Sequence, residues 1–452
     1  MTPQVTDVAA EAAEPAQGGA GQVTAGMPRP MARAGLERGM QPARPQLMRT
    51  MNEQLLLNQI RQLGLCSRAD LARLSGLSKP TVSLALANVE RSGLVRTAGQ
   101  RTGVPGRSAV LYEIRPDAGY VLGLDIGHEY LRGAIADLTG EIRAKAESRC
   151  AAASVRKRVG ELVRLADGIC AAAGVARADV TQTVLGSPGV YDPRRDAITL
   201  TGGMAGWDNP SVLAGLRGAF GEDLAVENDT DAAALAEREH GHGREFASFG
   251  FVSIGTGIGM GLVLGGQLHR GAHGVAGEIA FLPITEGPGG DVADEEVRRR
   301  GTMEAVGSAA AIVRAARRAG LRNRSARQVF AAAAAGDERA AAIVAAEARL
   351  VAKAICAIIA VVDPGLVVLG GGIGQAPGFA AAVSAELGRI APVLPELRVS
   401  ALGTGAVVDG CLASGADLAW RRLTAQLAQA QLAQVQAEQP SDGESAAGPT
   451  AT

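Results

Sequence analysis

The sequence predicts a two-lobed α/β domain that follows an N-terminal winged helix-turn-helix domain. Residues 49–115 have the pattern of three short helices followed by a pair of strands. From Tyr120 onward, strands alternate with helices, as in α/β domains. Two strand pairs with glycine-rich turns, starting near Val121 and Phe251, each open one half of this region. We therefore expect an internally duplicated fold.

Length and composition fit a large protein without membrane spans. At 452 residues the chain exceeds one ordinary domain, and its 47% hydrophobic and 20% charged residues suit a soluble protein with a large core. No run of about 18 apolar residues appears, and the N-terminus lacks a secretory pattern, so we expect no membrane partner. The scattered cysteines predict a reduced, cytoplasmic protein without disulfides: Cys66, Cys150, Cys170, Cys356 and Cys411.

Composition shifts divide the chain into four parts. Residues 1–45 are rich in Ala, Gly, Pro and Gln without periodicity, which predicts a disordered tail. We expect a winged helix-turn-helix domain at 46–115 and the α/β domain at 116–425. Residues 426–452 are expected to form a helical extension and a second disordered tail.

The first two helices are predicted from spacing and capping residues. Leu56, Ile60 and Leu63 recur at helical spacing, which predicts a first helix. Ser67 begins a Ser-Arg-Ala-Asp sequence, a capping-box-like start for a second helix that ends before Gly76.

The third helix and a hairpin complete the domain. Ser78 should cap the third helix, with Pro80 tolerated in its first turn because the first amides need no partner within the helix. Strands at 94–96 and 109–114 flank a loop rich in glycine, including Gly99. The expected buried face of the third helix comprises Val82, Ala85, Leu86 and Val89.

Positive charge concentrates in this domain. The whole chain has a formal net charge of −1, whereas the segment from Arg49 to Arg107 holds nine basic and three acidic residues, a net charge of +6. Such a segment suits the phosphate backbone of double-stranded DNA. The alternative is a protein-interaction module with solvated surface charges. For DNA, the expected base contacts are Lys79, Thr81 and Ser83, and the expected phosphate contacts are Arg101 and Arg107.

The α/β region is predicted element by element from the same patterns. Strands and helices should alternate through both halves, and a glycine run at 370–372 should end a strand. The expected strands are 121–127, 131–138, 183–191, one ending at Val226, the pair within 251–268, and 366–369. The expected helices are about 155–173, 295–319, 337–361 and 412–437.

Five ordered motifs resemble the ROK family of sugar kinases and related repressors. They are 123–127 (GLDIG), 136–140 (ADLTG), 226–229 (VEND), 254–259 (IGTGIG) and 276–278 (AGE). The resemblance covers about residues 50–425 and matches the repressor branch, in which a winged helix precedes the domain. It implies an actin- and hexokinase-like architecture that binds sugar and ATP between two lobes.

The resemblance also implies roles for individual residues. Asn228, Asp229, Glu278 and Glu304 match sugar-binding positions, and Asp229 matches the general base of the kinases. The alternative for Asp229 is a helix cap, because Asp is favoured there. The residues that match the phosphate loops are Asp125, Gly127, Gly255, Thr256 and Gly257.

Departures from the family pattern argue against zinc and against catalysis. Phe281 stands where the kinases have a zinc-binding histidine, and residues 282–303 lack the cysteines of the zinc motif, so we expect no metal and no cofactor. Packing of Phe281 and Leu282 is expected to hold this loop instead. His128 and Glu129 replace the Gly-Thr of the first phosphate loop, and Gly203 replaces a sugar-binding Asn, so the pattern does not favour ATP.

Taken with the resemblance, the sequence predicts a DNA-binding transcriptional regulator of carbohydrate metabolism genes, in particular a repressor. We expect a sugar or sugar phosphate to bind between the lobes and a homodimer or higher homo-oligomer to bind operator DNA. One alternative is an active ATP-dependent sugar kinase with a DNA-binding extension. The other is a DNA-binding protein whose α/β region is a ligand-free dimerisation scaffold.

Overall fold

A computed structural model describes residues 45–101, 109–150, 154–201, 204–284 and 294–438. Two expected site positions, Arg107 and Gly203, lie outside these ranges. From Arg49 onward, the described residues form one compact unit.

The N-terminal region has the predicted order of elements. The helix α1 (Pro45–Leu63) is followed by α2 (Arg68–Ser75) and α3 (Lys79–Arg91). Strand β3 (Ala109–Ile114) pairs antiparallel on one side with β2 (Val95–Arg101) and on the other with a short strand, β1 (Cys66–Ser67), that was not predicted.

Local capping fixes the ends of α2 and α3 as predicted. Ser67 and Asp70 form a reciprocal capping box, and Gly76 ends α2 in the left-handed conformation. The Ser78 side chain accepts a hydrogen bond from the Thr81 N–H at the start of α3. All four residues of the predicted apolar face of α3 are buried.

One expectation for this region is wrong: Gly99 lies within β2 rather than in a loop. The register shifts between Thr97 and Gln100, and Gly99 has φ of 114°, so it provides the backbone of a bulge that lengthens the strand.

The α/β region contains two five-stranded sheets built alike. In the first, the strand order is β10-β7-β4-β5-β6. Here β4, β5 and β6 are antiparallel neighbours, and β7 and β10 are parallel to β4 and to each other. In the second, order β13-β12-β11-β14-β15, the same pattern recurs. The predicted duplication is therefore confirmed.

The strand bounds of the two sheets are as follows. The first sheet comprises β4 (Tyr120–Ile126), β5 (Tyr130–Asp137), β6 (Ile142–Arg149), β7 (Val180–Ser187) and β10 (Ala225–Asn228). The second comprises β11 (Phe249–Ile254), β12 (Ile258–Leu264), β13 (Gln267–Leu268), β14 (Leu366–Gly370) and β15 (Glu396–Val399).

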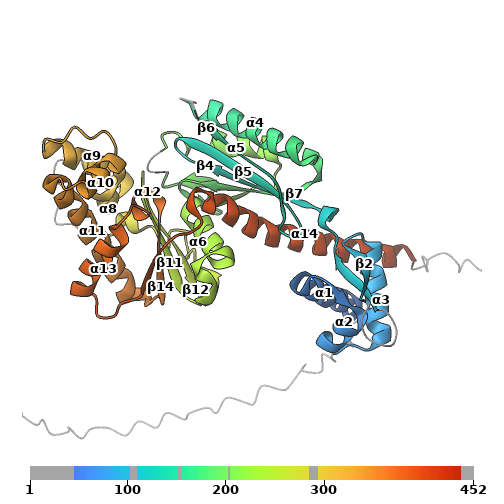
Figure 1. The fold of residues 1–452 in the computed structure, drawn as a ribbon. Helices are drawn as coiled ribbons and strands as arrows, with labels where there is room; N and C mark the ends of the chain where they lie inside the picture. The colour runs from blue at the N-terminus through green and yellow to red at the C-terminus, as the bar shows by residue number, and fades with distance from the viewer. Residues whose placement is uncertain (1–44, 102–108, 151–153, 202–203, 285–293, 439–452) are drawn as a thin grey trace, which may run out of the picture. The chain divides into compact units, whose positions relative to one another are not determined.

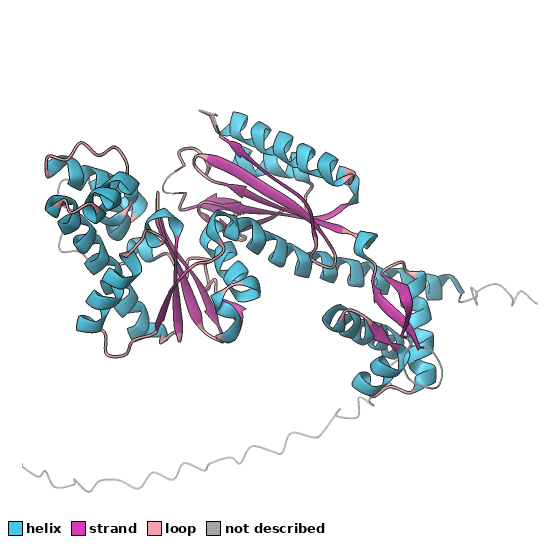
Figure 2. Cartoon of the chain, viewed as in Figure 1, coloured by secondary structure: helices cyan, strands magenta, loops and turns pink. Residues whose placement is uncertain are grey.

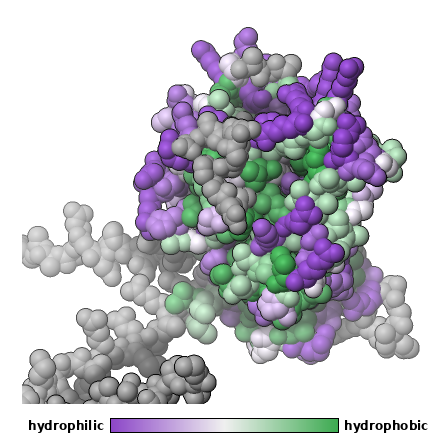
Figure 3. All heavy atoms as spheres, turned by 90° about the vertical axis from the view of Figure 1, so that its left-hand side faces the viewer, coloured by the Kyte–Doolittle hydropathy of each residue, from purple (hydrophilic) through white to green (hydrophobic). Residues whose placement is uncertain are grey.

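Helices cover both sheets (Figures 1 and 2). In the first lobe, α4 (Val155–Ala173) packs against β5 and β6, and α14 (Ala406–Glu438) packs against β4 and β7. In the second, α6 (Asp229–His240) packs against β11 and β12. The other helices are α5 (Pro210–Phe220), α7 (Asp294–Arg300), α8 (Thr302–Gly307), α9 (Ala309–Arg318), α10 (Ala326–Ala334), α11 (Glu338–Val362), α12 (Gly371–Gly374) and α13 (Phe379–Ile390). On the face that Figure 3 shows, hydrophilic residues are interspersed with groups of apolar ones.

The expected single helix at 295–319 is instead three helices, α7, α8 and α9. Gly301, with φ of 84°, separates the first two, and Ser308 separates the last two. A Cβ at Gly301 would lie 2.2 Å from the carbonyl oxygen of Ala280, so this break is also a point of close packing. No helix within the described ranges is long and apolar enough to cross a membrane.

The helices α6 and α14 cross in close contact, which places the start of both at the boundary between the two sheets. Gly410 of α14 lies against the backbone of α6, and a Cβ there would come within 1.7 Å of the Ala232 carbonyl oxygen. Because α6 follows β10 of the first sheet and packs on the second, this crossing joins the lobes.

Candidate functional site

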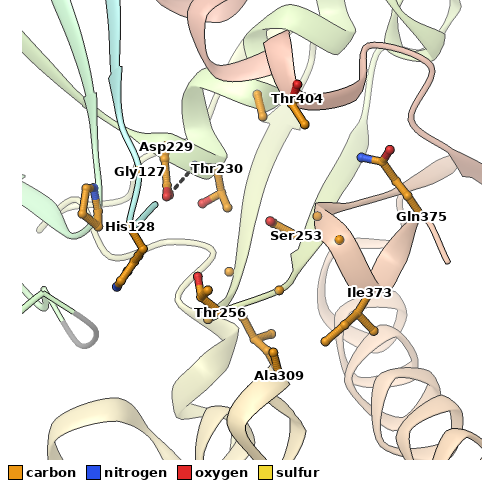
Figure 4. Close-up of a pocket in the computed structure, with 18 of the residues that line it drawn as sticks. Gly127, His128, Asp229, Thr230, Ser253, Thr256, Ala309, Ile373, Gln375 and Thr404 are labelled. Carbon is orange, nitrogen blue, oxygen red and sulfur yellow. Dashed lines mark hydrogen bonds between the residues drawn. The ribbon is translucent and has the colours of Figure 1, made fainter. Parts of the chain in front are cut away.

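A cavity of about 1000 Å³ opens between the lobes. Its walls come from the β4–β5 turn, the start of α6, the β11–β12 turn and the start of α14. Figure 4 shows His128 and Asp229 on one side, and Ile373, Gln375 and Thr404 on the other. Among the predicted site residues, the cavity is lined by Asp125, Gly127, Asn228, Asp229, Gly255, Thr256, Gly257, Glu278 and Glu304.

The start of α6 shows how the sequence positions Asp229. Asn228 is the N-cap: its Oδ1 accepts hydrogen bonds from the N–H groups of Thr230 and Asp231. Its Nδ2 also donates to the carbonyl oxygen of Gly189, at 3.0 Å. The interpretation of Asp229 as the cap is therefore wrong by one residue. Asp229 is the first residue of α6, and its Oδ1 accepts the Thr230 N–H (Figure 4).

The carboxylates of Glu304 and Glu278 differ in how many hydrogen bonds they accept from the described residues. The Oε1 of Glu304 accepts from Arg300 Nε at 2.8 Å, and its Oε2 accepts from the Ile258 N–H at 3.1 Å. Gly257 leaves room for this carboxylate, because a Cβ there would lie 2.8 Å from Oε2. The Glu278 carboxylate accepts no hydrogen bond from the described residues. Glu304 therefore braces the glycine turn, whereas Glu278 has free acceptors.

Desolvation changes the titration of these acids. Burial raises the pKa of Asp229 to about 6, with repulsion from Glu304 adding to it and His128 opposing it. Burial raises the pKa of Glu278 to about 7, and the charges of Asp229 and Glu304 raise it further. Such perturbed carboxyl groups in a cavity are typical of functional sites.

The first phosphate-like turn is held by the chain's own cations. Asp125 is buried, and its Oδ2 lies 3.3 Å from Arg132 Nη1. Burial raises its pKa to about 7, and Arg132 opposes the rise. From α4, Arg158 donates to the carbonyl oxygens of Gly127, at 2.6 Å, and His128.

The second turn keeps an open glycine backbone. The Gly255 N–H donates to the Gly257 carbonyl oxygen, and the Ala309 N–H at the start of α9 donates to the Gly255 carbonyl oxygen. Thr256 lies beside Ala309 in the cavity wall (Figure 4). Beyond this turn the cavity continues along α10, α12 and the residues before α14.

Sequence reasoning missed four basic residues that line the cavity: His128 was noted only as a departure, and Arg132, Arg300 and Arg327 were not singled out. Arg132 is a single basic residue on a strand, and Arg300 ends a run of three arginines in α7. Nothing in their local pattern distinguishes them from surface arginines. Only the fold brings Arg132 to Asp125, and places the Arg300–Glu304 pair beside the glycine turn.

The loop expected to hold zinc in the kinases is described only in part. Phe281 is 39% exposed, so the expectation that it packs to hold the loop is wrong, although Leu282 does pack against the core. Residues 285–293 lie outside the described ranges. Zinc content stays a prediction.

The predicted DNA-contacting residues lie on one helix and one strand. Lys79 is exposed at the start of α3, whereas Thr81 and Ser83 are half-buried. The Thr81 hydroxyl lies 2.8 Å from that of Ser78, so part of its hydrogen-bonding capacity serves the cap. Arg101 ends β2 and lies 3.5 Å from Asp70. The structure thus groups Lys79, Thr81 and Ser83 on one helical segment.

Comparison with known proteins gives consistent matches. The model of the ROK family matches residues 121–410. Over 239 residues the chain is 27% identical to a putative xylose repressor of Caldicellulosiruptor sp. (strain Rt8B.4). This alignment covers 53% of the chain and 60% of the repressor, so the chain spans less than two thirds of that relative's length.

Two solved structures share the fold. A ROK hexokinase from Thermus thermophilus is 31% identical, with a TM-score of 0.55, over 66% of this chain and 97% of that one. A ROK family transcriptional regulator, a homolog of the E. coli MLC protein, is 23% identical with a TM-score of 0.65. The match covers 86% of this chain and 99% of the regulator, and it demonstrates a common fold alone.

Proposed function

Because this chain belongs to the ROK family, whose model matches residues 121–410, we propose that it is a sugar-responsive transcriptional repressor. In this proposal residues 46–115 bind operator DNA and residues 116–425 bind a sugar or sugar phosphate. The last helix, α14, continues past this domain to Glu438. Two copies would bind the two halves of a palindromic operator.

The observation that carries the proposal is the joining of two features in one chain. A cavity with free carboxylate acceptors at Asp229 and Glu278 suits sugar hydroxyls, which need several directed hydrogen bonds to replace water. A short basic domain with an exposed Lys79 at the start of α3 precedes it. The similarity to a xylose repressor supports the same combination.

The geometry of the first turn favours binding over phosphoryl transfer. Phosphoryl transfer needs a positively charged cradle for the phosphates. Here the Arg132 guanidinium is engaged by Asp125 and Glu147, and Arg158 is engaged by backbone carbonyl oxygens. Glu129 adds a negative charge at the cavity wall. We therefore propose that a bound sugar dissociates without being chemically changed.

An ATP-dependent sugar kinase with a DNA-binding extension is the second candidate. Asp229 at the cavity wall, the open glycine turn of 255–257 and the 31% identity to a ROK hexokinase favour it. A coupled ADP-release assay over a panel of sugars separates the two functions.

The test of the repressor function uses the full-length protein, a duplex from upstream of its own gene, and D-xylose, D-glucose and N-acetyl-D-mannosamine as probes. We expect tight binding that at least one sugar weakens by about tenfold or more, which corresponds to about 1.4 kcal/mol. The Asp229→Asn variant should bind the duplex like wild type and lose the sugar response. Sugar-dependent ATP consumption that the variant loses would establish the kinase instead.

A further inference from the structure

The part of the cavity around Asp229, Glu278 and Glu304 has more negative charge than the cations there neutralise. Arg300 pairs with Glu304, and Arg132 pairs with Asp125 and Glu147. Asp229 and Glu278 form no ion pair with any described residue. Both line the same cavity, and their charges interact with each other and with Glu304.

This repulsion is visible in how both acids titrate. Their pKa values are raised to about 6 and about 7, first by burial and, for Glu278, next by Asp229 and Glu304. A neutral sugar brings hydroxyl donors but no charge, so the repulsion persists after it binds. An ammonium group brings three donors and a compensating charge into a site partly shielded from water, where electrostatic interactions are strengthened.

No basic side chain within the described ranges forms an ion pair with Glu278. The residue three positions further on, where the family resemblance expects a histidine, is Phe281. Arg270, which is close enough to Asp231 to affect its pKa, is bound to Glu227. A cationic ligand group would therefore take a place that no described side chain fills.

We infer that Glu278 is a specificity-determining residue that, with Asp229, selects a sugar bearing a free ammonium group over the parent sugar and its N-acetyl derivative. This inference rests on the proposed function, because it names the ligand class of the same site.

Calorimetric titration of the full-length protein tests the inference. The probes are D-glucosamine, D-mannosamine and D-galactosamine, each against its parent hexose and its N-acetyl form, at about pH 7 and low salt. At least one amino sugar should bind about tenfold more tightly than both counterparts. In Glu278→Gln, affinity for that amino sugar should fall about tenfold and affinity for the parent hexose by less than about threefold. The matched control Glu396→Gln removes an exposed carboxylate on β15 and should change neither.

The pH dependence of sugar affinity in the wild-type protein provides a second test that does not depend on a variant. As Asp229 and Glu278 ionise between about pH 5.5 and 7.5, amino-sugar affinity should rise by about fivefold, while N-acetyl sugar affinity should stay within about twofold. The other charged groups around these acids are His128, the buried Asp231 and three ion pairs: Arg300–Glu304, Arg270–Glu227 and Arg132–Asp125. Their effects act on both ligands, so the comparison isolates the ammonium group.

Each outcome of these titrations either supports or overturns the inference. A parent or N-acetyl sugar that binds as tightly as every amino sugar overturns the inference and leaves the sugar-responsive function standing. The same holds if Glu278→Gln keeps the preference for the amine. If neither amino sugars nor neutral sugars bind, the inference and the proposed sugar-responsive function both fail.

Discussion

At the scale of single residues, two buried acids lie outside the ligand-contacting set. Asp231 and Glu347 are each only 4% exposed, and one oxygen of each has no hydrogen-bond partner in the described structure. Burial raises the pKa of both to about 8, so both are mainly protonated near neutral pH. For Glu347, on α11, burial alone accounts for the rise.

We predict that Glu347→Gln becomes stabilising as pH rises. The folded state keeps Glu347 protonated up to about pH 8, whereas the unfolded chain ionises it above its ordinary value of 4.5. Wild type therefore loses stability across this window, and the variant does not. Relative to its value near pH 4, the variant's free energy of unfolding should gain at least about 1 kcal/mol by pH 8, since each pKa unit corresponds to about 1.4 kcal/mol.

Urea unfolding at about pH 4, 6 and 8 measures this difference. The exposed Glu338→Gln on the same helix serves as the control and should show no such trend. A pH-independent difference between Glu347→Gln and wild type would mean that this carboxyl group is ionised in the folded protein.

At the scale of elements, the crossing of α6 and α14 depends on glycine. Because a Cβ at Gly410 would come within 1.7 Å of the Ala232 carbonyl oxygen, Gly410→Ala must separate the helices. We expect a loss of about 1–3 kcal/mol, the usual cost of overpacking. The control Gly388→Ala, exposed within α13 with nothing within 4 Å, should gain about 0.5–1 kcal/mol. Thermal unfolding compares the two, and equal effects would contradict the tight crossing.

The predicted DNA-contacting residues give a second prediction at this scale. Replacing Arg101, an expected phosphate contact, by Ala should weaken binding to all duplexes and reduce the slope of log affinity against log salt by about 1. Ser83→Ala should instead change sequence preference. Fluorescence anisotropy at several salt concentrations measures both effects. An Arg101→Ala slope equal to that of wild type would exclude the phosphate contact.

At the scale of the whole molecule, α14 contacts both the cavity and α1. Its first residues, Ala406 and Val407, line the cavity. Further along, Asp417 lies 2.7 Å from Arg61 Nη2, and the Trp420 Nε1–H donates to Asn58 Oδ1 at 3.0 Å. One helix thus contacts both of the regions that the proposed regulation must couple.

We predict that breaking these contacts uncouples ligand binding from DNA binding. In the double variant Asp417→Asn and Trp420→Phe, sugar affinity should stay within about twofold of wild type, while the sugar-induced change in DNA affinity should fall by about fivefold or more. Calorimetry and DNA titration measure the two quantities separately. An unchanged sugar response would show that coupling runs through other contacts.

The sequence by itself determined what depends on neighbours along the chain. Ser67, Gly76 and Ser78 specify the ends of α2 and α3 because capping is a local hydrogen-bonding event. Apolar spacing identified the buried face of α3 and the strands that open each lobe, because periodicity reflects which face is buried. The strand β6 was not predicted, because its residues are largely polar and exposed and show no alternation of apolar and polar residues.

The tertiary structure decided which groups meet. The family motifs indicated Asp229 and Glu278 as site residues, but only the fold reveals that Glu304 is engaged by Arg300 and Ile258 while Glu278 keeps free acceptors. The same holds for the crossing at Gly410, whose neighbour Ala232 is distant in sequence. These features depend on distances between elements that the two lobes bring together, and no local pattern encodes such distances. Local hydrogen bonding and periodicity fix the elements, whereas packing between them fixes the charge balance of the site.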